Sequence, residues 1–176
     1  MCNELKGNPL FACVTLEEDV RSETSKLFAT LFENEKDSKK INKELKSIYD
    51  ETNYIGTLYY MAKSYYYMKD ENQAIDLFIE SAKAGDLRSI EMLAQHFINQ
   101  IASYLFASQM WCKKGLEVSE SELYHLDFQY LLAKNYIIEA ITYDRKNQYE
   151  EALEMMKDLA NQNYLPAIQF LQLIEK

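Results

Sequence analysis

The chain is poor in the residues that break helices. Its 176 residues include four glycines and two prolines, too few for the turns of an all-β sandwich or for flexible linkers between several domains. A chain of this length buries roughly two-thirds of its unfolded surface as one domain without metals or disulfides. The scarcity of glycine and proline therefore favours an all-α fold of long helices.

Cysteine and histidine are also scarce. The three cysteines, Cys2, Cys13 and Cys112, have no metal-ligand spacing, and their odd number excludes a complete disulfide framework. Cys112 lies in a helical stretch, and we interpret it as a small buried side chain. The two histidines, His96 and His125, have no companion at ligand spacing. We therefore expect no metal, no cofactor and no catalytic residues, and predict that the protein is not an enzyme.

The sequence lacks a long apolar run. Stretches such as Tyr136–Ile141 are far shorter than the roughly 20 residues that a bilayer span needs. Met1 is followed at once by polar residues, which is not the pattern of a signal peptide. A cysteine directly after Met1 is also what remains when methionine replaces the signal peptide of a bacterial lipoprotein. Cys2 is therefore a candidate lipidation site, and the bacterial cytoplasm and the periplasm both stay open as locations.

Negative charge is in excess. The formal net charge of −9 repels phosphate backbones and anionic lipid surfaces at long range. This balance argues against a general nucleic-acid or membrane-surface binder, and it would steer a basic protein partner towards the chain.

The first part of the chain differs from the rest. Residues 1–21 have no helical period, and we expect an irregular arm there. From Ser22 onward apolar residues recur at helical spacing, and a polar run then separates two expected helices, Ser22–Glu35 and Ser38–Asp50. Residues 22–50 are thus predicted to form a helical hairpin that caps a single α-helical domain over 22–176.

The segment 54–88 carries the strongest pattern. Apolar or small side chains recur on one face of each of two helices. They are Leu58, Met61, Ala62 and Tyr65 on the first helix, and Ala74, Phe78 and Ala82 on the second. Gly85 then ends the second helix. A helix pair of this kind cannot bury its apolar face without stacked neighbours.

Copies of this pattern follow along the chain. An offset of 78 residues pairs small and apolar positions: Ala62 with Ala140, Tyr65 with Tyr143, Ala74 with Ala152, Phe78 with Met156, Ala82 with Ala160, Leu87 with Leu165, Ile90 with Ile168 and Leu93 with Leu171. Gly85 meets Asn163, which also tolerates left-handed geometry. A looser middle unit contains Leu93, Ala94 and Phe97, then Ala107, Trp111, Lys114 and Gly115. We predict repeats at about 54–88, 89–122 and 123–166, and a capping helix over 166–176.

These positions resemble tetratricopeptide repeats, and more closely their Sel-one-like subclass, over roughly residues 54–176. The resemblance rests on Ala62 and Tyr65, then on the Ala-x-x-x-aromatic and Ala-x-x-Gly spacings of Ala74, Phe78, Ala82 and Gly85. It implies an α-solenoid of stacked antiparallel helix hairpins that binds peptides or protein surfaces on its concave side, without enzymatic activity of its own.

Tyrosine is abundant, with fourteen residues. If Leu58 and its companions face the core, a separate stripe remains on the side that lines the groove in the related repeats. The predicted partner-binding residues are Tyr59, Lys63 and Tyr66, with Glu91, Gln95 and Ile98 in the middle unit. An equally good interpretation is that the tyrosines pack against the N-terminal hairpin or the next repeat.

The expected function is protein binding. Size, acidity and Cys2 favour a bacterial immunity protein that neutralises a cognate toxin, and the alternative within this class is an adaptor, chaperone or scaffold of a secretion or envelope system. Self-association through exposed tyrosines is a further alternative. An enzyme or small-ligand sensor is the rival from another class, and it requires a polar pocket that the sequence does not reveal.

Overall fold

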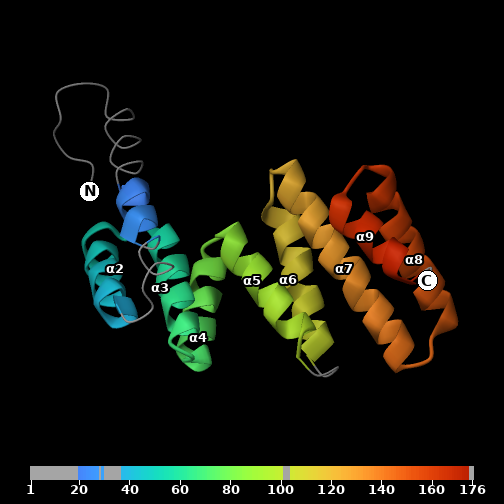
Figure 1. Ribbon diagram of the computed structural model, residues 1–176, viewed down its shortest axis with the longest axis horizontal. Coiled ribbons are helices and arrows are strands. Elements are labelled where there is room, and N and C mark those ends of the chain that lie inside the picture. Colours follow the sequence, from blue (N-terminus) through green and yellow to red (C-terminus); the bar gives the residue numbers. More distant parts are fainter. Residues whose placement is uncertain (1–19, 28, 30–36, 101–103, 175–176) are drawn as a thin grey trace. The chain divides into compact units, whose positions relative to one another are not determined.

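The computed structural model describes residues 20–27, 29, 37–100 and 104–174, and these residues form helices and no strands (Figure 1). The predicted all-α class is therefore confirmed for this part of the chain. Residues 20–27 are helical, so Val20 and Arg21 already belong to a helix that was expected to begin at Ser22. The labelled helices are α2 (Ser38–Thr52), α3 (Ile55–Tyr67), α4 (Glu71–Lys83), α5 (Leu87–Ile98), α6 (Leu105–Val118), α7 (Glu122–Thr142), α8 (Lys146–Asn161) and α9 (Leu165–Ile174). No described helix is both long and apolar enough to cross a bilayer.

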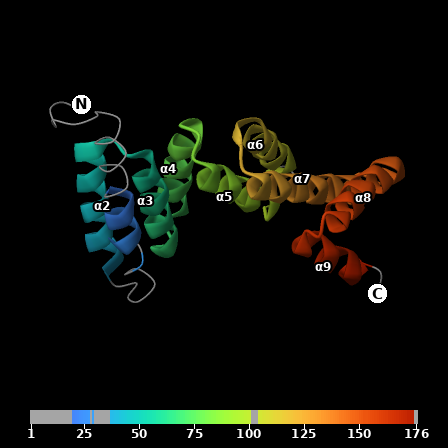
Figure 2. The ribbon, with the colours of Figure 1, turned by 90° about the horizontal axis from the view of Figure 1, so that it is seen from above.

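The chain divides into two compact units, Met1–Asp86 and Leu87–Lys176. In the first unit α2 packs on α3 and α3 on α4, and the three helices lie side by side (Figure 2). Ile41 and Leu45 of α2 form its core with Leu58 and Met61 of α3. Polar contacts add to this packing, since the Tyr49 hydroxyl lies 3.5 Å from Glu80 Oε1 on α4.

The predicted faces of α3 and α4 are the buried ones. Leu58, Met61 and Ala62 are at most 6% exposed, whereas Tyr65 is half-buried at the end of this face. On α4 the residues that recur every fourth position are almost completely buried: Ala74, Phe78 and Ala82. The small alanines let the two helix backbones approach closely around the single large ring of Phe78.

The second unit contains two apolar clusters. Ala133 and Ile137 of α7 pack with Met156 of α8 and Ala167 of α9. The other cluster joins α5, α6 and α7 and contains Ala94, Cys112, Leu131 and Leu132. Each helix of this unit packs on the next one along the chain, and α5 also contacts α7.

The buried face of α6 is rotated from the predicted one. Ala107 and Trp111 are half-buried and Lys114 is exposed, while Ser108 and Cys112 are fully buried. The sequence pattern misplaced this face because Ser108 is polar. Its hydroxyl donates to the Ala94 carbonyl at 2.7 Å, so a serine can occupy a core position.

Asn135 of α7 completes this buried polar group. Its amide nitrogen donates to Ser108 Oγ at 2.9 Å and to the Leu131 carbonyl at 2.8 Å, and the residue has no exposed surface. The amide thus ties α7 to α6 inside the core.

The ends of α4 and α8 have the same geometry. Gly85 and Asn163 both have positive φ, 92° and 61°. The amide of Asp86 donates to the Ser81 carbonyl at 3.2 Å, and the amide of Tyr164, 78 residues further on, donates to the Leu159 carbonyl at 3.1 Å. The predicted equivalence of Gly85 and Asn163 is therefore confirmed.

The preceding turns correspond at a different offset. Lys69 after α3 and Asp144 after α7 also have positive φ, and they lie 75 residues apart. The amide of Asp70 donates to Tyr65, and that of Arg145 donates to Ala140. Structurally, Tyr65 therefore corresponds to Ala140 and not to Tyr143. The difference of three residues arises because α4 has 13 residues and α8 has 16.

Candidate functional site

The predicted tyrosine stripe is partly used for packing in the first unit. The Tyr59 ring lies 5.9 Å from the Phe78 ring of α4 and 5.3 Å from the Tyr60 ring, measured between centroids. Tyr59 and Lys63 are half-buried, and Tyr66 is 38% exposed. Of these three residues Tyr66 is the most accessible to a partner.

The other predicted residues lie on α5 in the second unit. The Gln95 amide donates to Glu91 Oε1 at 2.7 Å, so these two side chains hold each other. Ile98 is 6% exposed and belongs to the helix packing of this unit, which leaves a partner little of its surface to contact. Cys2 lies outside the described residues.

The histidines and Cys112 form no reactive cluster in the described segments. The His96 ring packs edge-on against Phe97 with the centroids 5.2 Å apart, and His125 is half-buried. No group of three or more metal-binding side chains occurs within these segments. Cys112 has no exposed surface, and its burial raises the pKa of the thiol to about 12, so the prediction of a buried small side chain is confirmed.

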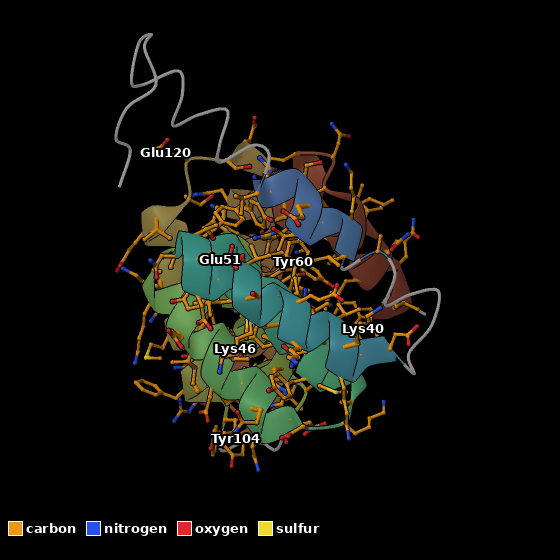
Figure 3. All side chains as sticks on the ribbon, turned by 90° about the vertical axis from the view of Figure 1, so that its left-hand side faces the viewer. Lys40, Lys46, Glu51, Tyr60, Tyr104 and Glu120 are labelled. Carbon is orange, nitrogen blue, oxygen red and sulfur yellow. The ribbon has the colours of Figure 1, made fainter. Side chains whose placement is uncertain are left out.

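The first unit has a groove of about 490 Å³ between α2 and α3. Its floor is apolar and its rim is basic. We call it the lysine groove, and its lining residues are Lys39, Asn42, Lys43 and Lys46 of α2, Met61 and Tyr65 of α3, and Met68 and Asp70 after α3. Figure 3 faces α2, with Lys40 and Lys46 labelled along it.

Helical spacing brings the three lysines together. Lys39, Lys43 and Lys46 stand at positions i, i+4 and i+7 of α2, which places them on one side of the helix. All three are exposed, and none of them forms an ion pair or hydrogen bond with another described residue. The neighbouring Lys40 differs, since its ammonium group lies 3.9 Å from Glu44.

Two polar groups accompany the lysines. Asp70 is the only acid that lines this groove, and its carboxylate caps α4 by accepting from the Gln73 amide at 3.3 Å. Asn42 is 7% exposed, and its side-chain oxygen accepts no hydrogen bond from the described residues. Leaving such a buried group unpaired costs about 1–3 kcal/mol. The groove therefore combines uncompensated positive charge with an unused acceptor.

The second unit has a smaller groove of about 430 Å³ along α6, α7 and α8. Its central acid, Glu139, is already occupied. Gln109 donates to Oε2 at 2.7 Å, and Arg145 donates to Oε1 at 3.1 Å. Because both carboxylate oxygens have partners, this groove offers less unpaired charge to a ligand than the lysine groove does.

Sequence reasoning missed the lysine groove. The signal was present, because lysines recur at i, i+4 and i+7 in α2 of a chain with a net charge of −9. It was overlooked because charged residues on a helix are usually a solvated face. Only packing against Met61 and Tyr65 of α3 turns that face into the wall of a groove.

No protein-family model, curated protein or solved structure matches this chain.

Proposed function

We propose that this protein is a non-enzymatic binding module built from stacked antiparallel helix hairpins of the tetratricopeptide or Sel-one-like kind. The recurrence of one helix-pair geometry supports this architecture. The turns at Lys69 and Asp144 match in backbone conformation and hydrogen bonding, and so do the helix ends at Gly85 and Asn163. Repeats of this type present grooves between helices to other proteins.

The lysine groove is the observation that carries the binding function. It is open to solvent along α2, and it combines half-buried Tyr65 and Met68 with the charged rim. Protein-binding sites typically combine an apolar, aromatic or methionine-rich centre with a polar rim. Tyr66 on α3 extends the accessible aromatic surface of the same unit.

Within this class we propose an immunity protein that binds and neutralises a bacterial toxin. The net charge of −9 supports this, because it speeds the approach of a basic toxin at long range. Neutralisation then follows from covering the surface through which the toxin reaches its substrate.

The test begins with affinity capture from the native organism, using the full chain and a Lys63→Ala/Tyr66→Ala variant. The captured protein is purified, its binding is remeasured by calorimetry, and its toxicity is assayed with and without the chain. We expect one partner, bound in a defined ratio, whose toxicity the chain suppresses. A non-toxic secretion or envelope component as the partner would replace the immunity proposal with that of an adaptor. Catalytic turnover of a small molecule by the chain would overturn the binding proposal itself.

A further inference from the structure

We infer that the lysine groove binds an acidic segment of a partner protein, with a leucine-sized or methionine-sized apolar side chain at its centre. This inference rests on the proposed binding function and adds to it the chemistry of the partner. It was not expected from the sequence, whose net charge of −9 points to a basic partner.

The two charge effects act over different distances. At physiological ionic strength charges are screened over about 8 Å. The excess of negative charge over the whole chain therefore steers molecules during approach, whereas a bound segment experiences the groups lining the groove. Those groups are Lys39, Lys43 and Lys46, opposed by Asp70, which the Gln73 amide already engages. Within the groove the surplus charge is positive.

The apolar floor selects a peptide over a small anion. Met61, Tyr65 and Met68 lie between the basic rim and α3. Methionine adapts its shape to an apolar partner, and tyrosine contributes a broad surface with little entropy to lose. Free phosphate or a nucleic-acid backbone would use the lysines alone and leave this floor without a function, so an acidic segment with an apolar centre fits more of the groove.

Asn42 gives the segment a hydrogen-bond partner. Its side chain is more than nine-tenths buried in the wall of the groove, and its oxygen has no donor among the described residues. The backbone N–H groups of an extended peptide are donors of the kind it lacks. Charge, apolar floor and unused acceptor thus point to the same class of ligand.

The experiment measures peptide binding to the full chain by fluorescence anisotropy. The probe is a short labelled peptide with two leucines flanked on both sides by glutamates, and the comparison peptides replace the glutamates by glutamines or the leucines by serines. We expect the acidic leucine peptide to bind at least about tenfold more tightly than either comparison peptide, and to weaken as salt is raised.

A matched pair of variants locates the site. In Lys39→Gln/Lys43→Gln/Lys46→Gln we expect at least about a tenfold loss of affinity, since several exposed ion pairs each contribute a small factor. The control, Lys114→Gln/Lys146→Gln/Lys157→Gln, makes the same change in net charge on exposed residues of the second unit, and it should keep the affinity within about twofold. Equal losses in both variants would overturn the inference, because they would show a general charge effect.

A third variant tests the floor. Met68→Gln keeps the size of the side chain and makes it polar, and Met68 is only half-buried, so the fold should persist. We expect this variant to reduce the preference for leucine over serine. Phosphate that competes for the lysines while the leucine preference is absent would replace the acidic segment with a phosphate group as the ligand.

The outcome is separable from that of the proposed function. If the acidic peptide does not bind but the chain still captures and neutralises a partner through another surface, only the inference about the lysine groove fails. If no partner exists and the peptide binds, the groove stands and the immunity proposal fails.

Discussion

Gly115 of α6 and Phe128 of α7 lie in direct contact. A Cβ atom added at Gly115 would be 2.4 Å from two atoms of the Phe128 ring, and Phe128 has no exposed surface into which the ring could move. The absence of a side chain at Gly115 is what allows α6 and α7 to pack this closely. A glycine inside a helix normally costs about 0.5–1 kcal/mol relative to alanine, so this position accepts poor helix propensity in return for close packing.

We therefore predict that Gly115→Ala destabilises the protein, although alanine favours helix formation. Overpacking of this kind costs about 1–3 kcal/mol, which exceeds the gain in propensity. Denaturant unfolding monitored by circular dichroism measures the effect. The matched control is the same substitution in a Phe128→Leu background, where the smaller side chain leaves room and the loss should shrink. A stabilising Gly115→Ala would show that the helices separate without cost.

Gly85 makes a different prediction, because nothing lies within 4 Å of a Cβ added there and only its backbone conformation matters. Its φ of 92° is unfavourable for residues with a side chain, so Gly85→Ala should cost about 1–2 kcal/mol. Gly85→Asn should cost less, because asparagine already occupies the equivalent position at Asn163. Equal losses in the two variants would contradict this account of the helix end.

The Tyr164 hydroxyl donates a hydrogen bond to Asp127 and links the start of α9 to α7. Burial, followed by the bond to Asp127 and the charge of that carboxylate, raises the pKa of Tyr164 above its ordinary value of 10.0. Above pH 10 the unfolded chain therefore loses this proton before the folded chain does. Folding stability should accordingly fall as the pH rises beyond about 10.

Tyr164→Phe tests this prediction. The variant should be less stable at neutral pH by about 0.5–1.5 kcal/mol, the usual net value of one hydrogen bond, and its stability should fall less steeply above pH 10. Some dependence should remain, because burial also raises the pKa values of Tyr49 and Tyr130. The measurement is chemical denaturation at several pH values, and parallel curves for the two proteins would refute the assignment to Tyr164.

Cys112 should be chemically silent in the folded protein. A thiol with a pKa of about 12 and no exposed surface offers almost no thiolate at pH 8. In a Cys2→Ser/Cys13→Ser variant, a disulfide reagent should therefore give no fast reaction with the native protein and one equivalent of reaction in denaturant. Rapid labelling of the native variant would show that α6 opens locally.

The sequence by itself determined the helical class and most buried faces. Scarce glycine and proline, and repeated apolar spacing, required long helices, and Ala74, Phe78 and Ala82 lie where that spacing placed them. The matching helix ends at Gly85 and Asn163 were also predictable, because few residue types tolerate positive φ. Local patterns were sufficient for these features because they depend on the conformations of neighbouring residues.

Only the tertiary structure decided which polar residues are buried and which charged ones share a groove. Ser108 enters the core because the Ala94 carbonyl of another helix accepts its hydrogen bond. The three additional residues of α8 moved the equivalent of Tyr65 from Tyr143 to Ala140. Lysines on α2 became a candidate site because α3 supplies an apolar floor beside them. Each of these outcomes depends on a partner from a different helix, which helical spacing within one segment does not specify.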